Sequence, residues 1–195
     1  MIIRAKRLLR ENRRLRLCVL ISLAVLLVGS AAAIAWNKTM YHFQTVDPGK
    51  VYRSGTLSEF ALGIARRIYG IKTIVNLRSE REMKDHWYAR EKAFAEANGM
   101  QLINIPMPPD TPPAPEQIAK FLAVATDPQM QPLLVHCEMG VIRTGMMVAV
   151  YDISVLKRPN DQVFSDLPWF GHTFERRPAV KEFILDYRPG FARSN

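Results

Sequence analysis

The stretch Val135-His136-Cys137-Glu138-Met139-Gly140-Val141-Ile142-Arg143-Thr144-Gly145 decides how the rest of the sequence is interpreted. The apolar residues Leu133 to Val135 lead into it, and a second apolar run, Met146 to Leu156, follows it. This pattern predicts a strand, a tight loop and a helix that begins near Arg143. Such a loop directs successive backbone N–H groups at one point above the positive end of a helix, so it is suited to hold an anion.

A thiol and a guanidinium accompany this predicted anion site. Cys137 lies at its base and Arg143 at its rim. A cysteine attacks only as thiolate, and loop N–H groups, a helix dipole and a nearby arginine bring thiol pKa values down to roughly 3.5–7.5. Arginine holds two phosphate oxygens in a bidentate fork. We therefore predict a phosphate site with Cys137 as nucleophile, in which Thr144 offers its hydroxyl to the departing sulfur and His136, which precedes the loop, orients rather than acts as the base.

The loop itself lacks a proton donor for a leaving oxygen. Asp110 is the best candidate, because the proline-rich run 106–115 places it on a stiff loop between a predicted strand and a predicted helix. Asp127, before Pro128, is the reserve candidate. The side chain of Glu138 is expected to point outward, because a carboxylate inside the loop would repel a phosphate.

Composition limits the possible partners and cofactors. The 195 residues carry a net charge of +9, but residues 1–16 hold seven basic side chains and one acidic side chain, which leaves +3 for residues 37–195. The basicity is mostly an N-terminal feature, so no nucleic-acid partner is expected. The two cysteines are Cys18, inside an apolar run, and Cys137, so neither a disulfide framework nor a cysteine-based metal site is predicted, and no metal or cofactor is expected.

Residues 17–36 form a run of twenty residues without a charge, long enough for a helix to cross the roughly 30 Å hydrocarbon core of a bilayer. The basic residues before it predict an N-terminus in the cytoplasm and residues 37–195 outside, in the periplasm if the source is bacterial. Alternatively, Ala33-Ile34-Ala35 is a signal-peptidase site and the remainder is secreted. The expected parts are a basic cytoplasmic tail (1–16), a transmembrane signal anchor (17–36), a tether (37–50) and a catalytic domain (51–195).

Apolar strands alternate with helices in residues 51–156. Strands are predicted at 51–54, 71–77, 100–105 and 133–136. Helices are predicted to end near Tyr69, to cover 82–98 and 116–125, and to run from near Arg143 to about Leu156. One or two further helices are expected after residue 160, with 178–187 the better candidate. This alternation predicts an α/β domain with a central, mostly parallel sheet flanked by helices. The cysteine loop then lies at the carboxyl end of a central strand, where such folds bind ligands.

The residues His136 to Gly145 read His-Cys-x-x-Gly-x-x-Arg-Thr-Gly. This resembles the signature loop of the cysteine-dependent protein-tyrosine phosphatases, and the similarity extends over residues 50–160 to their compact dual-specificity-like branch, including its bacterial members. The resemblance implies a dual-specificity phosphatase-like fold and a reaction without metal. It also implies that Cys137 forms a phosphocysteine, that Arg143 binds phosphate, and that Asp110 is general acid and then base.

The variable loop positions bear on the substrate. Branches that act on inositol phosphates often carry lysine or extra arginine in the loop, whereas this loop has no cation besides Arg143, which suits a phosphate on an apolar or aromatic carrier. Arg53 and Arg78 can supply further charge at the rim. The backbone expected to bind phosphate, together with the Arg143 side chain, belongs to Glu138, Met139, Gly140, Val141 and Ile142.

A protein-tyrosine or dual-specificity phosphatase acting on a phosphorylated protein is therefore the expected function. The alternatives are a phosphatase of the same fold that acts on membrane phospholipid or inositol phosphate, a non-catalytic phosphate-binding module, and a rhodanese-like sulfur-transfer loop. The rhodanese-like reading leaves Asp110 and the pair Arg143-Thr144 without a purpose.

Overall fold

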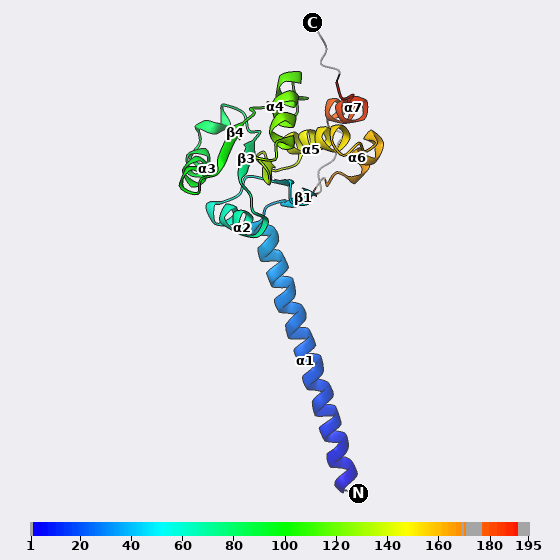
Figure 1. The fold of residues 1–195 in the computed structure, drawn as a ribbon. Helices are drawn as coiled ribbons and strands as arrows, with labels where there is room; N and C mark the ends of the chain where they lie inside the picture. Colours follow the sequence, from blue (N-terminus) through cyan, green and yellow to red (C-terminus); the bar gives the residue numbers. More distant parts are fainter. Residues whose placement is uncertain (1, 169, 171–176, 191–195) are drawn as a thin grey trace. The chain divides into compact units, whose positions relative to one another are not determined.

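The computed structural model describes residues 2–168, 170 and 177–190, with the backbone alone for 2–16. Internal contacts divide the chain into two units, Met1–Lys38 and Thr39–Asn195. Residues 2–38 of the first unit lie in one continuous helix, α1 (Ile2–Thr39) (Figure 1). Its part Leu17–Thr39, 23 residues long, has the length and composition to cross a membrane, a test that a signal sequence near an N-terminus also passes.

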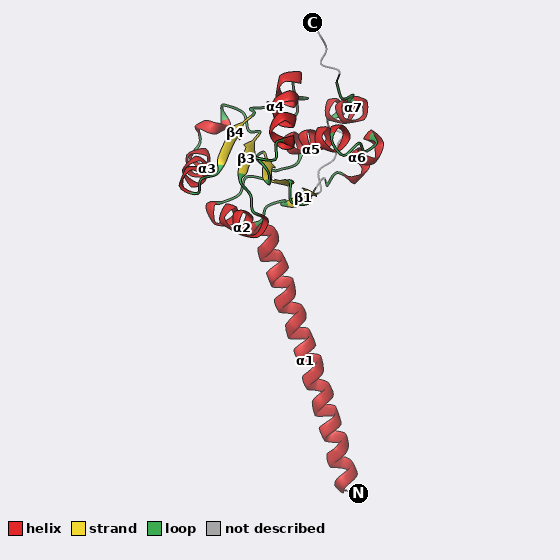
Figure 2. Ribbon diagram, in the orientation of Figure 1, coloured by secondary structure: helices red, strands yellow, loops and turns green. Residues whose placement is uncertain are grey.

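The second unit is built on a five-stranded sheet with the strand order β1-β2-β5-β3-β4. The strands are drawn in yellow in Figure 2, among the red helices. β2, β5, β3 and β4 run parallel to one another, and β1 pairs antiparallel with β2 at one edge. The predicted α/β fold with flanking helices is confirmed, and the sheet is mixed because of β1. The strands are β1 (Gln44–Asp47), β2 (Val51–Ser54), β3 (Thr73–Asn76), β4 (Gln101–Asn104) and β5 (Leu133–His136).

The strand β1 was not expected from the sequence. It falls inside the stretch 37–50 that was predicted to be a tether, so residues 44–47 belong to the sheet instead. Besides the pairing of β1 with β2, two side-chain hydrogen bonds reach the Asp47 carboxylate at the end of this strand: one from Lys50 Nζ at 3.3 Å and one from the Tyr151 hydroxyl at 2.9 Å. A four-residue strand with mixed exposure carries little periodicity of its own.

The two faces of the sheet bury different residues of the same strands, as the two-residue period of a strand requires. Val75 and Val135 pack on one face, in a core completed by α4, α5, α6 and α7. Ile74 and Leu134 pack on the other face, against α2 and α3. The helices are α2 (Glu59–Tyr69), α3 (His86–Ala97), α4 (Pro115–Thr126), α5 (Ile142–Ser154), α6 (Asn160–Asp166) and α7 (Pro178–Asp186), with a 3-10 turn, η1 (Glu82–Lys84), before α3.

The ends of α2 show how local sequence determines an element. Ser58 precedes the helix and its hydroxyl accepts a hydrogen bond from the Ala61 N–H at 3.3 Å. Gly70 ends the helix with φ +69°, a left-handed conformation that glycine adopts without a steric cost. The chain then enters β3 directly. Because β2, β3, β4 and β5 are parallel, the segments that follow their carboxyl ends meet at one edge of the sheet, where the functional site is expected.

Candidate active site

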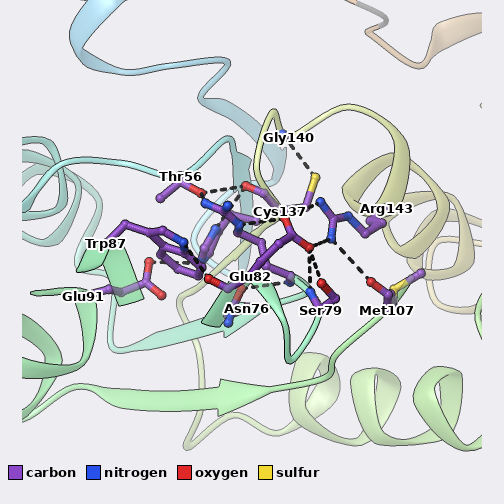
Figure 3. A network of polar contacts seen from close by, with 12 residues as sticks. Thr56, Asn76, Ser79, Glu82, Trp87, Glu91, Met107, Cys137, Gly140 and Arg143 are labelled. Carbon is purple, nitrogen blue, oxygen red and sulfur yellow. Dashed lines mark hydrogen bonds and ion pairs between the residues drawn. The ribbon is translucent and has the colours of Figure 1, made fainter. Parts of the chain in front are cut away.

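The predicted cysteine loop, residues 137–143, is called the phosphate loop below. β5 ends at His136 and α5 begins at Ile142, so the loop connects the central strand to the start of the helix, as the sequence predicted. Cys137 is buried, and the Gly140 N–H donates a hydrogen bond to its Sγ at 3.2 Å (Figure 3). The loop therefore already directs one N–H at the sulfur.

Gly140 is required by two separate features of the loop. Its φ of +72° is left-handed, and a Cβ at this position would lie 2.3 Å from the backbone carbon and oxygen of Ser54. The loop therefore rests directly on the end of β2, with no room for a side chain.

Thr56, just after β2, binds the first two loop carbonyls. Its hydroxyl donates to the Cys137 carbonyl oxygen at 3.1 Å, and its N–H donates to the Glu138 carbonyl oxygen at 3.0 Å. A single residue thus holds two successive carbonyls of the loop on its outer side.

The next two carbonyls are held by residues from further upstream. His42 Nδ1 lies 2.7 Å from the Met139 carbonyl oxygen and must carry a proton there, since a carbonyl only accepts. Arg53 Nη2 donates to the Gly140 carbonyl oxygen at 2.7 Å. In a planar trans peptide the C=O and the N–H of the same unit point in opposite directions. Holding the carbonyls of residues 137–140 outward therefore turns the N–H groups of residues 138–141 inward, which makes an anion site.

Arg143, in the first turn of α5, is held by Glu82 of η1. Its Nη1 and Nη2 donate to the two carboxylate oxygens at 2.5 and 3.0 Å, and Nη1 also lies 3.4 Å from the Met107 carbonyl oxygen (Figure 3). These contacts use the end-on edge of the guanidinium. Its side-on edge, Nε and the second hydrogen of Nη2, has no partner among the described residues and remains available to two oxygens of an anion.

This ion pair stays charged over the whole physiological range. Burial opposes the ionised form of Glu82, but hydrogen bonds from Arg143 and Ser79 outweigh it and lower the Glu82 pKa to about 2. Burial likewise opposes the charged form of Arg143, and the Glu82 hydrogen bond, helped by the charges of Cys137 and Glu82, raises its pKa above the ordinary value.

Arg78 and Arg53 do not lie at the rim, where the sequence suggested they supply charge. Arg78 is buried, stacks over Trp87 with its Cζ 3.9 Å from the ring centroid, and donates to Glu82 at 3.0 Å and to the Thr56 hydroxyl at 3.2 Å. Arg53 is 1% exposed, and its Nε and Nη1 lack partners among the described residues. Both arginines lie behind the loop because their strands end beneath it, so we correct the rim assignment.

Burial shapes the titration of the charges behind the loop. It lowers the Arg53 pKa to about 10, against the smaller opposing effects of Cys137 and Asp152, so Arg53 remains charged at neutral pH. Burial raises the Asp152 pKa to about 6, although Arg158 binds this carboxylate at 3.1 Å.

His136 faces a buried carboxylate from α3 that the sequence did not single out. Its Nε2 lies 3.0 Å from Glu91 Oε1, and both side chains are almost fully buried. The two atoms are within ion-pair distance but are not aligned as a hydrogen bond. The Trp87 ring lies edge-on at 6.4 Å. These neighbours fix the imidazole beneath the loop.

Asp110 and Asp127 lie apart from the loop. Asp110 has a left-handed φ of +57°, is half exposed, and accepts a hydrogen bond from Arg177 Nε at 2.6 Å. Its carboxylate has no contact with the phosphate loop among the described residues. Asp127 ends α4 and accepts from the Gln129 N–H at 2.8 Å, which is a turn contact.

The other predicted site residues lie in or directly after the loop. Thr144 is fully buried, and its hydroxyl has no hydrogen-bond partner among the described residues, so it does not bond Sγ here. Glu138 and Met139 are exposed, and Val141 is buried. No group of three or more His, Cys, Asp or Glu side chains within the described ranges is arranged to hold a metal ion.

Sequence reasoning missed Glu82, Glu91, Thr56 and His42. Glu82 carried a usable signal, because Ser79-x-x-Glu82 is a capping-box spacing directly after β3. In the structure the Glu82 carboxylate indeed accepts from the Ser79 N–H at 2.9 Å and from its hydroxyl at 2.6 Å. The other three have no local signal, since each acts on a residue far away along the chain.

The family model described as "DSP-PTPase phosphatase fused to NAD+ Kinase" matches residues 43–167, more than half of the chain. The chain belongs to this family. The resemblance to the cysteine-dependent protein-tyrosine phosphatases is therefore confirmed, and the chain is a phosphatase-type enzyme of that superfamily. The match covers β2, the phosphate loop and α5, which carry the geometry described above.

Plant chloroplast proteins and several solved structures are similar to parts of this DSP-PTPase chain. The rice protein "Probable NAD kinase 2, chloroplastic" (Oryza sativa subsp. japonica) is 33% identical over 99 residues, which is 50% of this chain and 10% of that protein. This chain thus spans about a tenth of the relative's length. The PP-IP phosphatase SIW14 from S. cerevisiae has a TM-score of 0.64 at 21% identity, covering 77% of this chain and 87% of that one. P. aeruginosa TpbA has a TM-score of 0.59 at 18% identity, covering 77% and 93%.

Proposed function

We propose that this DSP-PTPase phosphatase hydrolyses phosphomonoesters through a phosphocysteine on Cys137, with phosphotyrosine in proteins as its main substrate. The observation that carries the proposal is the phosphate loop. Its carbonyls at residues 137–140 are held outward, one N–H already donates to Sγ, and the side-on edge of Arg143 has no partner among the described residues. This arrangement suits a phosphoryl group with three anionic oxygens above a nucleophilic sulfur.

In the first step the Cys137 thiolate attacks phosphorus. The S–P bond forms, the bond from phosphorus to the ester oxygen breaks, and Asp110 gives its proton to the leaving oxygen. The inward N–H groups and Arg143 stabilise the negative charge on the transferred oxygens. Asp110 must reach the leaving oxygen from its position beside Arg177, so its loop has to move or the carboxylate must exchange partners.

In the second step water attacks the phosphocysteine. Asp110, now a carboxylate, takes a proton from the water, the S–P bond breaks, and inorganic phosphate leaves. The sulfur departs as thiolate. The Thr144 hydroxyl, buried and without a partner among the described residues, can turn to donate to that sulfur. His136, fixed by Glu91, keeps its orienting role.

The substrate class is proposed from the charges near the loop. Arg53 and Arg78 are buried behind it, and the exposed side chains on it are the carboxylate of Glu138 and the apolar Met139. Among the described residues, a polyanionic ligand would gain no second arginine there and would meet a carboxylate. A single phosphate on an aromatic carrier fits better than an inositol polyphosphate, and a lipid phosphate is the second candidate because the domain follows a potential membrane span.

We also propose that residues 17–36 anchor the protein, with residues 1–16 in the cytoplasm and the catalytic domain outside. The apolar stretch and the basic residues before it support this orientation. Cleavage after residues 33–35, which would release the domain, is the alternative.

The full chain in detergent micelles tests the function. We expect phosphotyrosyl peptide to be turned over with a kcat/KM at least about tenfold above that of phosphoseryl peptide, short-chain lipid phosphate and inositol hexakisphosphate. Cys137→Ser should abolish turnover. Asp110→Asn should slow the hydrolysis of an alkyl phosphate by a factor of roughly 10²–10⁴. It should slow the hydrolysis of p-nitrophenyl phosphate much less, since a good leaving group needs no acid.

Three outcomes would contradict the proposal. Turnover retained by Cys137→Ser would exclude the covalent mechanism. An equal effect of Asp110→Asn on both leaving groups would move the acid role to another residue. A preference for lipid phosphate would replace the proposed substrate class while leaving the chemistry in place.

A further inference from the structure

Three upstream residues hold the phosphate loop, and His42 differs from Arg53 and Thr56 in where it lies along the chain. Arg53 and Thr56 flank the end of β2, in the body of the sheet. His42 lies only three residues after the last residue of α1, Thr39, which is also the last residue of the potential membrane span. The phosphate loop is therefore hydrogen-bonded to a residue of the short segment that follows α1 in the sequence.

The His42 ring is fixed in place by its neighbours. It stacks between Tyr41, at 4.2 Å between centroids, and Phe170, at 3.9 Å with the planes 9° apart. Its backbone is left-handed, with φ +53°, a conformation that non-glycine residues adopt in only a few per cent of cases. With the ring position determined on both faces, Nδ1 is directed at the Met139 carbonyl oxygen at 2.7 Å.

The segment that carries His42 is itself attached to the loop support. The Gly55 N–H donates to the Tyr41 carbonyl oxygen at 2.9 Å, and the Tyr41 ring fills the space where a Gly55 Cβ would lie, 2.4 Å away. Met40 is 2% exposed. Residues 40–42 are thus packed into the catalytic unit rather than hanging free of it.

We propose that His42 is a positioning residue of the active site, which holds the Met139 carbonyl outward so that the Gly140 N–H faces the sulfur and the phosphate. The peptide unit between Met139 and Gly140 has one C=O and one N–H pointing in opposite directions. On the inner side of this unit, the Gly140 N–H donates to Cys137 Sγ at 3.2 Å. On the outer side, His42 Nδ1 donates to the Met139 carbonyl oxygen at 2.7 Å. Without the outer bond, this peptide is free to rotate and present its carbonyl to the anion.

The inference extends the proposed function, on which it rests, by assigning a residue outside the loop to phosphate binding. His42 touches neither sulfur nor phosphate, so its effect should appear in anion affinity as well as in rate. Removing a hydrogen bond to a carbonyl that must stay outward is worth about a tenfold change in binding.

Two substitutions in the full chain separate the hydrogen bond from the stacking. His42→Asn keeps a donor near the position of Nδ1 and tolerates a left-handed φ, but loses the ring. His42→Phe keeps a ring between Tyr41 and Phe170 but has no donor. His86→Phe, at an exposed histidine that begins α3, is the matched control.

The readouts are the inhibition constant of inorganic phosphate, kcat/KM for p-nitrophenyl phosphate and the thermal midpoint. We expect His42→Phe to weaken phosphate binding about tenfold and to lower kcat/KM by a similar factor. For both quantities, His42→Asn should stay within about threefold of wild type and His86→Phe should be unchanged. Wild-type phosphate affinity in His42→Phe would overturn the proposal. Equal losses in His42→Asn and His42→Phe that follow the thermal midpoint would also overturn it, because they indicate a purely structural role.

A measurement on the unsubstituted protein does not depend on how the variants fold. A carbonyl acceptor requires the proton on Nδ1, so nitrogen NMR of ¹⁵N-histidine-labelled protein at pH 8 should show His42 as the Nδ1–H tautomer. The Nε2–H tautomer would refute the bond. If wild type hydrolyses no phosphomonoester, the proposed function fails, whereas calorimetric binding of inorganic phosphate to Cys137→Ser, with and without His42→Phe, still decides the role of His42.

Discussion

Glu82 binds the Arg143 guanidinium through both carboxylate oxygens, at 2.5 and 3.0 Å, across 61 residues of sequence. The same carboxylate accepts from Arg78 and from Ser79, so the segment after β3 fixes the arginine of the phosphate loop. Because the contact uses the end-on edge, the carboxylate orients the guanidinium and leaves its side-on edge for a substrate.

Glu82→Gln should reduce kcat/KM about tenfold or more. Glutamine offers one acceptor oxygen and turns an amide NH2 group toward the guanidinium, so Arg143 loses its bidentate partner. Steady-state kinetics on the full chain measure the effect, with the exposed neighbour Glu80→Gln as a control that should retain wild-type rates.

The pH dependence of this pair follows from the sign of its shift. The Glu82 pKa is lowered from 4.5 to about 2, so its contribution to stability is fully present above about pH 4.5 and is lost as the pH falls through about 2. Acid unfolding followed by circular dichroism should therefore differ between wild type and Glu82→Gln at neutral pH and converge below about pH 2. A constant difference down to that pH would refute the assignment.

Gly140→Ala should disrupt the loop. A Cβ would lie 2.3 Å from the Ser54 backbone, and the φ of +72° is unfavourable for alanine, so we expect about 1–3 kcal/mol of destabilisation and loss of phosphate binding. Gly63→Ala, in the middle of α2 with open space around it, should instead stabilise by roughly 0.5–1 kcal/mol. Urea denaturation of both variants gives the two free energies, and the same sign for both would contradict this reasoning.

Glu91→Ala should destabilise the protein by about 1–3 kcal/mol, since it leaves the buried Nε2 of His136 without a polar neighbour. Glu91→Gln keeps an acceptor oxygen and should cost less. On the same helix, Glu96 forms an exposed pair with Lys92 at 3.9 Å, and Glu96→Ala should change the free energy of unfolding by less than about 0.5 kcal/mol. Chemical denaturation compares the three, and a similar cost for Glu91→Ala and Glu96→Ala would argue against the buried pair.

Arg177→Gln should release Asp110. The ion pair holds a half-exposed carboxylate that has no contact with the phosphate loop among the described residues. An exposed pair is worth about 0.2–1 kcal/mol, so kcat/KM for an alkyl phosphate should rise by up to about fivefold. In the Asp110→Asn background the same substitution should have no effect. A gain that persists in that background would show that Arg177 acts elsewhere.

The membrane orientation can be tested on intact cells or spheroplasts. If residues 17–36 are an uncleaved anchor, the full-length protein of 22.3 kDa should resist carbonate extraction, and added protease should digest the catalytic domain from outside. A soluble species lacking about the first 35 residues would support signal-peptide cleavage instead. Protection of the domain until the membrane is permeabilised would reverse the proposed orientation.

The sequence alone determined the features that depend on neighbouring residues. The strand ending at His136, the loop through Gly140 and the helix containing Arg143 follow from apolar runs and a glycine within a few positions of one another. β3 and β5 are buried along their whole lengths, as their continuous apolar runs predicted for parallel strands covered on both faces. The residue types of the loop also indicated its family, because the thiol, the glycine and the guanidinium that the chemistry needs lie within seven positions, 137–143.

Only the tertiary structure decided what surrounds that loop. His42 lies 97 residues before Met139, Arg53 lies 87 before Gly140, and Glu82 lies 61 before Arg143. Such contacts arise because parallel strands bring the segments after their carboxyl ends to one edge of the sheet, and no local pattern records which side chains meet there. For the same reason the sequence predicted that Arg53 and Arg78 supply charge at the rim of the loop, whereas both lie buried behind it, where their strands end.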